Sequence, residues 1–298
     1  MAQIAVTGAT GQIGRFLCAR LHQDGHELTF LGRSRPEFAK AGDTFQEWHL
    51  SDTSVRLRGA EALVHCALAH QPGKYRGGEG DDPHGFIDLN VDGTLALFKA
   101  ARDAGVRHTV FLSSRAVYTP VADWAILKEA ADTNPDTLYG QVKLAGEQAL
   151  AMTCETSDMA GTALRVTGVY GCPPGMSTHK WSELFEAFER GAAISPRVGT
   201  EVHGDDLASA LALVLDNPVK QDDQPISIYN VSDVIVDRQD LLSAYAKKTG
   251  IEMALPPRAP GPVGVLSPAK LAGLGWVPGG KERLQQFVQS LPVLSRTG

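Results

Sequence analysis

The chain has 298 residues, a net charge of −6 and 43% hydrophobic residues. This length is enough for a large buried core and for two lobes. The acidic balance argues against nucleic-acid binding, and without a run of about eighteen apolar residues no membrane span is expected. The four cysteines, Cys18, Cys66, Cys154 and Cys172, lie far apart and lack metal-ligand spacing. We therefore expect buried reduced thiols, no metal site and a cytoplasmic location.

Apolar strand patterns alternate with helical patterns through the first half of the chain. Strands are predicted near residues 2–6, 27–31, 45–49, 62–65, 108–112 and 162–166, and helices near 12–24, 86–104 and 137–154. This alternation predicts an α/β fold, a Rossmann-type doubly wound parallel sheet with helices on both faces. The predicted dinucleotide-binding domain is 1–166.

The pattern changes after residue 167. Helices are predicted near 179–190, 205–216 and 237–249, and a proline-rich connector runs from Pro256 to Pro268. Residues 167–298 are predicted to form a smaller C-terminal substrate-binding lobe, some of whose elements cross back to the sheet.

A glycine-rich turn follows the first predicted strand. Residues 7–14 read Thr-Gly-Ala-Thr-Gly-Gln-Ile-Gly and stand directly before a helical pattern. Glycine permits positive φ and lets a ligand approach the backbone closely, and a helix N-terminus favours an anion. The residues expected to cradle a pyrophosphate are Gly8, Thr10, Gly11, Gln12 and Ile13. A tight strand–helix turn without a ligand is the alternative.

The end of the second predicted strand bears on the choice of cofactor. NAD-selective enzymes usually carry an acid at this point, to bond the ribose hydroxyls. Here Gly32 takes that place and Arg33 follows. A guanidinium suits a 2′-phosphate through its paired N–H donors, which favours NADP over NAD. A solvated loop charge is the alternative for Arg33.

A tyrosine and a lysine stand four residues apart in the helix predicted for 137–154. Tyr139 and Lys143 therefore share one helical face, and the strand before this helix ends in Ser113-Ser114. A phenol has an ordinary pKa near ~10, and a neighbouring cation favours its ionised form. Tyr139 is therefore the expected acid–base group, with Lys143 as its cation.

Together these motifs resemble the short-chain dehydrogenase/reductase superfamily, in particular its extended branch, the NAD(P)-dependent epimerase/dehydratase family. The pattern TGxxGxxG, a strand-end serine and YxxxK occur in the family's order, and residues 274–278 resemble its C-terminal signature. The resemblance implies that Ser114 polarises the substrate oxygen, that Tyr139 moves the proton and that Lys143 also bonds the nicotinamide ribose. It implies further cofactor contacts from Leu50, Cys66, Ala67, Leu68, Asn90 and Thr167. Because Asn90 is expected at a helix start, N-capping is its alternative role.

The sequence says less about the substrate. Nucleotide-sugar enzymes of this family carry an arginine and an asparagine at positions that correspond to Gly199 and Gly168 here, although Arg197 lies two residues from the first. Two segments are candidates to line the pocket: the loop from His70 to His84, with Lys74, Tyr75 and Arg76, and the segment 179–181.

Three functions fit these features. The first is an NAD(P)-dependent oxidoreductase with net hydride transfer to or from a sugar-like or small hydroxy or carbonyl substrate. The second is a nucleotide-sugar epimerase or dehydratase with tightly bound NAD. The third is a non-catalytic NADP-sensing regulator, against which the Tyr–Lys pair argues. The expected partner is a small-molecule substrate, with a possible homodimer through helices 86–104 and 137–154. The candidate contact residues are Ala96, Leu97, Ala100 and Ala101 on the first helix and Leu144, Ala145 and Gln148 on the second. Covering the sheet is the alternative role of these residues.

Overall fold

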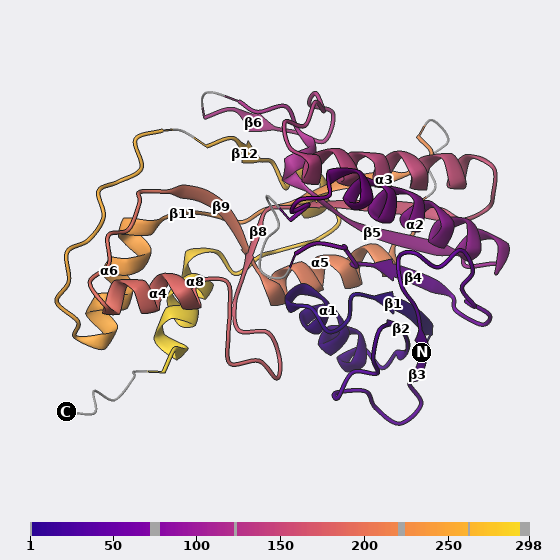
Figure 1. Ribbon diagram of the computed structural model, residues 1–298, viewed down its shortest axis with the longest axis horizontal. Helices are drawn as coiled ribbons and strands as arrows, with labels where there is room; N and C mark the ends of the chain where they lie inside the picture. The colour runs from indigo at the N-terminus through magenta and orange to yellow at the C-terminus, as the bar shows by residue number, and fades with distance from the viewer. Residues whose placement is uncertain (1, 72–77, 122–123, 220–223, 262, 293–298) are drawn as a thin grey trace.

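The computed structural model describes residues 2–71, 78–121, 124–219, 224–261 and 263–292. A seven-stranded sheet forms the core of the larger part of the protein (Figure 1). All strand pairs are parallel, and the strand order is β10-β7-β5-β4-β1-β2-β3. The strands are β1 (Gln3–Thr7), β2 (Glu27–Gly32), β3 (Thr44–Glu47), β4 (Ala62–His65), β5 (His108–Ser114), β7 (Ala160–Val166) and β10 (Ser227–Val231). The predicted Rossmann-type parallel sheet is confirmed.

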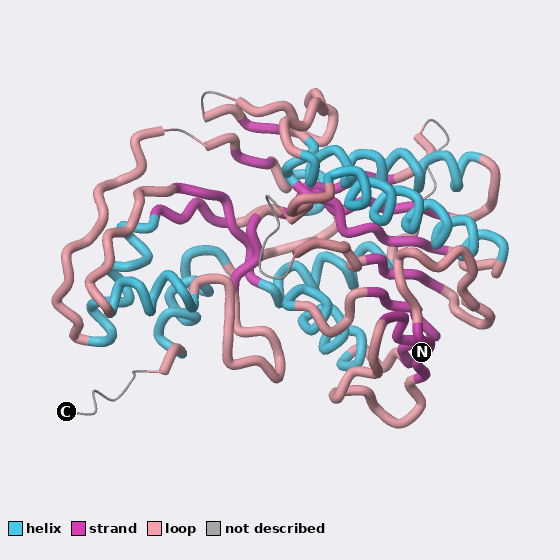
Figure 2. Tube along the Cα trace, viewed as in Figure 1, coloured by secondary structure: helices cyan, strands magenta, loops and turns pink. Residues whose placement is uncertain are grey.

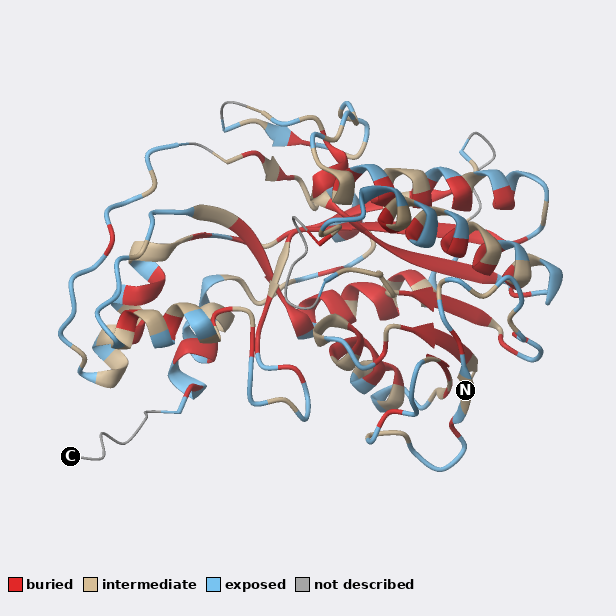
Figure 3. Cartoon of the chain, viewed as in Figure 1, coloured by how far each residue is buried: buried red, intermediate tan, exposed pale blue. Residues whose placement is uncertain are grey.

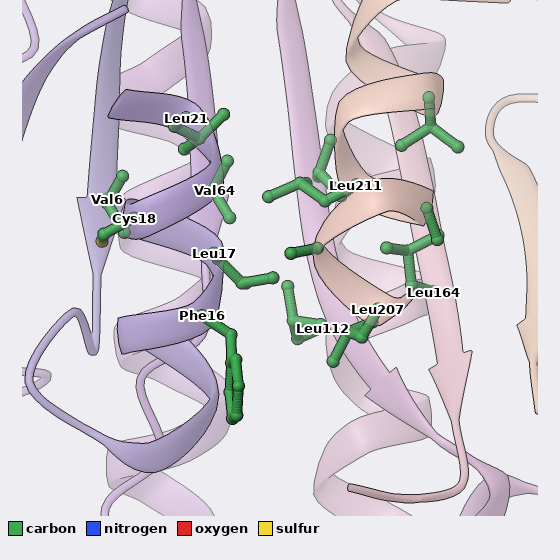
Figure 4. Packing of buried hydrophobic residues seen from close by; sticks show 14 of the residues in the cluster. Val6, Phe16, Leu17, Cys18, Leu21, Val64, Leu112, Leu164, Leu207 and Leu211 are labelled. Carbon is green, nitrogen blue, oxygen red and sulfur yellow. The ribbon is translucent and has the colours of Figure 1, made fainter. Parts of the chain in front are cut away.

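Helices cover both faces of this sheet. One face carries α1 (Gln12–Gln23) and α5 (Gly204–Asp216), whose leucines meet inward-facing strand residues such as Val64 and Leu164 (Figure 4). The other face carries α2 (Pro83–Asp103) and α3 (Leu138–Glu155). Because both faces are covered, β5 and β7 are buried along their whole length (Figure 3).

A smaller lobe is built from elements that follow residue 166. We use this name for β8 (Gly168–Tyr170), β9 (Val198–His203), β11 (Val234–Asp237), α4 (Ser182–Glu189), α6 (Arg238–Thr249) and α8 (Gly280–Ser290) (Figure 2). Its three strands form a second sheet in the order β11-β9-β8. Its core is aromatic: Tyr170 stacks on Trp181 at 5.2 Å, and Phe185 on Tyr245 at 4.2 Å.

Short elements join the two parts. The 3₁₀ turn η1 (Arg115–Val117) follows β5, and β6 (Ile126–Leu127) pairs with β12 (Val265–Leu266), just before α7 (Ala269–Ala272). Arg115 donates to Thr200 Oγ1 of β9 at 2.9 Å and to the Gly264 carbonyl at 3.0 Å. These contacts connect the carboxyl end of β5 to the smaller lobe.

Several expectations are corrected by the structure. The second half contains strands as well as helices, since β8, β9, β10, β11 and β12 were not predicted. Leu97 and Ala101 do not face a partner surface: they are buried in the core between α2 and the sheet. A homodimer through α2 and α3 stays a prediction.

Of the cysteines, Cys18 and Cys154 are buried, whereas Cys66 is half-buried and Cys172 is exposed. No described helix is long and apolar enough to cross a membrane.

Candidate active site

The predicted site residues gather at the carboxyl edge of the central sheet. Thr7 at the end of β1 lies opposite His65 at the end of β4, and Ser114 at the end of β5 lies opposite Val166 of β7. The glycine turn, the segment after β4, Ser114 and Thr167 therefore meet along one edge. In open parallel sheets, ligands bind outside this edge. Thr167 is held there by a bond from its amide to the Val231 carbonyl, at 3.1 Å.

The glycine turn packs so closely on its neighbours that Gly8 and Gly14 have no room for a side chain. Gly8 has φ +69°, and a β-carbon there would lie 2.8 Å from the Ala67 nitrogen. A β-carbon on Gly14 would lie 2.2 Å from the Gly8 carbonyl oxygen. Gly11 is the N-cap of α1, and among the described residues no side chain caps this helix, so the amides of Gln12 and Ile13 are not bonded by a capping group. An open cradle at a helix N-terminus fits the pyrophosphate of a dinucleotide. Thr10 and Gly11 are exposed beside it.

A hydrogen-bond network fixes the segment that follows β4. Thr7 Oγ1 accepts from the amides of Cys66 and Ala67, each at 3.1 Å. Its own hydrogen therefore goes to His65 Nδ1 at 2.7 Å, which leaves His65 Nε2 to donate to Thr94 Oγ1 at 3.0 Å. Burial lowers the pKa of His65 to about 3, so this ring is neutral. The network holds residues 65–67 against Gly8.

Asn90 does not open a helix, so N-capping, the alternative role considered for it, is wrong. Helix α2 begins seven residues earlier at Pro83, with Asp82 as its cap. Asn90 is buried and bonds Ala69 twice, accepting from its amide at 2.8 Å and donating to its carbonyl at 2.9 Å. It thereby fixes the segment that carries Leu68 beside the glycine turn. Its contact with a cofactor stays a prediction.

The two peripheral cofactor candidates lie near the ends of β2 and β3. Arg33 is exposed just after β2, and a β-carbon on Gly32 would meet open space. Leu50 is half-buried after β3, and its carbonyl oxygen would lie 2.1 Å from a β-carbon on Gly93 of α2. The loop with Leu50 is therefore packed closely on α2.

Tyr139 and Lys143 lie on one side of α3, next to the end of β5. The Lys143 ammonium is 6.0 Å from the Tyr139 ring centroid and donates to the Leu112 carbonyl at 2.7 Å. Helix α3 comes this close to the end of β5 because residue 140 is glycine, since a β-carbon there would lie 2.3 Å from the Ala116 carbonyl oxygen. The start of α3 therefore packs directly on η1, the turn that follows Ser114.

Burial lowers the pKa of Lys143 to about 8, and the Glu147 carboxylate acts against this shift. Cys66 also lies close, but burial raises the pKa of its thiol to about 12, so the thiol is protonated near neutral pH. Lys143 is therefore a buried cation that titrates close to the working range of an enzyme.

The two serines at the end of β5 have different partners. Ser113 is buried and its hydroxyl donates to Glu147, which also pairs with Arg165 at 2.7 Å. Ser114 Oγ accepts from the Ala116 amide at 3.2 Å and caps η1. Neither Glu147 nor Arg165 was predicted from the sequence to belong to the site. The available signal was a single charge inside the otherwise uncharged strand 160–166, which must have a partner when buried.

The smaller lobe carries a pocket of about 310 Å³ between β9, α4 and α6. Its lining includes Lys180, Arg197, Gly199, Glu201 and Arg238. Lys180 and Glu201 form an ion pair, and a β-carbon on Gly168 would lie 2.0 Å from the Lys180 nitrogen. This pair therefore fills the space beside Gly168. Lys74, Tyr75 and Arg76 of the other predicted loop lie outside the described residues.

The sheet order, the glycine turn and the Tyr–Lys helix define an NAD-binding Rossmann fold of the extended short-chain dehydrogenase/reductase type. A model of the family described as "NAD dependent epimerase/dehydratase family" matches residues 4–232. The chain belongs to this family, and the predicted resemblance is confirmed.

Curated relatives match parts of the chain. It is 28% identical over 211 residues to a UDP-glucose 4-epimerase of Streptomyces lividans, which covers 67% of this chain and 63% of that protein. It is 34% identical over 115 residues to an uncharacterized protein of Mycobacterium tuberculosis, which covers 38% of this chain and 12% of that one. The chain thus spans less than two thirds of the length of these relatives.

Solved structures match almost the whole chain. A crystal structure of a UDP-galactose 4-epimerase superposes with a TM-score of 0.80 at 23% identity, covering 97% of this chain and 98% of that one. A UDP-glucose 4-epimerase of Thermus thermophilus, in complex with NAD, gives a TM-score of 0.77 at 25% identity, with coverage of 97% and 98%. At 23% identity, the likeness to the UDP-galactose 4-epimerase concerns the fold alone.

Proposed function

We propose that the protein is an NAD(P)-dependent oxidoreductase that acts on a hydroxyl or carbonyl carbon of a sugar-like substrate. The observation that carries this proposal is the placement of Tyr139 and Lys143. Lys143 is a buried cation bonded to the Leu112 carbonyl, and Gly140 brings the same helix against the turn that follows Ser114. A base, its cation and a hydroxyl donor thus share one edge of the sheet.

The residues around β1 and β4 hold the cofactor in this proposal. Gly8, Gly11 and the amides of Gln12 and Ile13 bind the pyrophosphate, and Lys143 bonds the nicotinamide ribose. Leu50, Cys66, Ala67, Leu68, Asn90 and Thr167 complete the binding surface. When bound, the nicotinamide ring accepts or supplies the hydride.

Three side chains act on the substrate. Ser114 donates a hydrogen bond to the reacting oxygen and polarises it. Tyr139 takes the proton from the substrate hydroxyl during oxidation and returns it during reduction. Lys143 stabilises the ionised phenol by its charge. Because the Ser113 hydroxyl is already engaged by Glu147, Ser114 is the better candidate for the first of these roles.

Net hydride transfer is the first form of this function, and sugar epimerisation is the second. The epimerase form is favoured by the names of the similar proteins. The net-transfer form is favoured by Gly168 and Gly199, which stand where nucleotide-sugar enzymes of the family carry an asparagine and an arginine. The Lys180–Glu201 pair fills the space beside Gly168. The test is a panel of hydroxy sugars and nucleotide sugars followed by NADH absorbance. Turnover with a stoichiometric absorbance change supports net transfer, and turnover of a nucleotide sugar without it supports epimerisation. The regulator alternative predicts no turnover at all.

We propose that the cofactor is NAD, whereas NADP was expected from Arg33 in the sequence. The similar structure with 25% identity contains NAD, and the NADP preference rests on Arg33 alone. Substituting Arg33→Asp tests the role of this residue. If Arg33 only faces solvent, the ratio of NADPH to NADH affinity should change less than about threefold, as for a screened surface charge. If it binds a 2′-phosphate, NADPH affinity should fall at least about tenfold. Fluorescence titrations with both nucleotides measure the ratio, with exposed Arg35→Asp as the control.

NADH affinity should depend on the charge of Lys143. The lysine is protonated below its pKa of about 8 and neutral above it. As pH rises through this value, the ribose loses a charged donor, so affinity should fall about tenfold or more, since such bonds contribute about 1.5–3 kcal/mol. NADH fluorescence titrations between pH 6 and 10 measure this fall in affinity with rising pH, which we call the limb of the pH profile. Lys143→Met should bind weakly with little pH dependence, whereas exposed Lys99→Met should retain the limb. A wild-type affinity that is flat through pH 8 contradicts the assignment.

A further inference from the structure

Two side chains of α3, one helical turn apart, hold consecutive residues at the end of β5. The Lys143 ammonium donates to the Leu112 carbonyl at 2.7 Å. The Glu147 carboxylate accepts the hydroxyl hydrogen of Ser113. The next residue along the strand is Ser114. Helix α3 therefore binds the strand end directly before the proposed catalytic serine.

Glu147 is itself fixed from behind by Arg165 of β7. The guanidinium donates to both carboxylate oxygens, from Nε at 3.0 Å and from Nη2 at 2.7 Å. Its remaining nitrogen, Nη1, donates to the Glu129 carbonyl at 3.0 Å, and the group lies 4.7 Å from the Tyr118 ring centroid. Both side chains of the pair are only 4% exposed. A buried ion pair often adds little to stability beyond what well-packed apolar residues give, which favours a role in the site.

Of the titratable groups that face Lys143, Glu147 is the one that carries a charge near neutral pH. From α3 it is faced by Tyr139 and Glu147, and from the end of β4 by His65 and Cys66. His65 is neutral, because burial lowers its pKa to about 3. The Cys66 thiol is protonated, because burial raises its pKa to about 12. Arg165 lies behind Glu147 and pairs with its carboxylate.

We propose that Glu147, locked by Arg165, is a positioning residue that aligns Ser114 through Ser113 and keeps Lys143 in its ammonium form. The proposal rests on the assignment of Lys143 to the cofactor ribose. It treats the buried pair as part of the active site, although neither residue faces the reacting atoms. Replacing only one member would leave an unpaired buried charge, so the test replaces both.

The test compares the pH dependence of NADH affinity in wild type and in the double variant Glu147→Met/Arg165→Met. The wild-type limb should lie at the Lys143 pKa of about 8. Loss of the neighbouring carboxylate should move it about one pH unit lower, since a close opposite charge shifts a pKa by ~1–3 units. The matched control is Glu186→Met/Arg190→Met, which removes an exposed ion pair between α4 and its C-cap residue and should leave the limb in place.

Each outcome decides one of the two proposals. A flat wild-type profile contradicts the role of Lys143. A wild-type limb that stays at the same pH in the folded double variant overturns the role of Glu147 and leaves the pair purely structural. If the methionine variant does not fold, Glu147→Gln/Arg165→Met keeps the shape of residue 147 and its bond to Ser113. This variant should show the same downward shift, and an unchanged limb there overturns the proposal equally.

Discussion

Substituting Tyr139→Phe should lower the rate of hydride transfer by roughly 10²–10⁴, the usual contribution of a positioned acid–base group. The phenyl ring keeps its packing beside Lys143, 6.0 Å away, so only the ionisable oxygen is lost. NADH affinity and the unfolding midpoint should therefore remain near wild type. The measurement is single-turnover NADH absorbance with a substrate from the proposed panel, beside a thermal melt.

The control for this substitution is Tyr245→Phe. It also removes one phenol oxygen, but that oxygen bonds Glu189 in the smaller lobe. It should change the rate less than about threefold while testing the general cost of losing a buried hydroxyl. A Tyr139→Phe enzyme with wild-type turnover would rule out the proposed mechanism and assign the proton to another group.

Substituting Gly14→Ala should destabilise the protein and weaken cofactor binding together. The new β-carbon would lie 2.2 Å from the Gly8 oxygen and 2.7 Å from the Ala9 α-carbon, and both are backbone atoms. Relief requires α1 to move away from the glycine turn, so the free energy of unfolding should fall by about 1–3 kcal/mol, the usual cost of overpacking. NADH affinity should fall at least about tenfold, because the displaced turn no longer presents the amides of α1.

Urea denaturation and NADH titration measure these two effects. Gly32→Ala is the matched control, because its β-carbon meets nothing within 4 Å and its φ is not left-handed. Its stability should stay within about 0.5 kcal/mol of wild type, as for most substitutions away from packed features. If Gly14→Ala unfolds at the wild-type urea concentration, α1 is not in the tight contact described here.

The sequence predicted the parts of the fold whose signals are local. Strands β1, β4, β5 and β7 each contain a short apolar run and are buried along nearly their whole length, and this pattern is typical of a parallel sheet covered on both faces. Strand β9 was missed because Val198–His203 contains glycine, threonine, glutamate and histidine, and its partners come from distant parts of the chain. Strands β6 and β12 have two residues each, so only their pairing defines them.

The same distinction applies to the candidate site. Gly8, Tyr139 and Lys143 carry spacings that can be identified within a few residues of sequence. The roles of Glu147 and Arg165 depend on a contact between α3 and β7, which no local spacing predicts. Asn90 shows a different error. The Asp82-Pro83 pair that starts α2 is a recognisable cap with proline in the first turn, and it places Asn90 in the helix interior.

The position of β10 has a consequence for how the chain can be divided. In sequence this strand lies between two parts of the smaller lobe, after β8, α4 and β9 and before β11, α6 and α8. It is nevertheless the edge strand of the central sheet and pairs with β7 from Ser227 to Val231. A fragment that stopped at residue 166 would leave β7 as an open edge, with its row of unpaired amides and carbonyls facing solvent. Such an edge is a template for aggregation. We therefore expect truncation at residue 166 to give an aggregation-prone fragment, and a chimera that keeps residues 1–166 must take this last strand from its second parent.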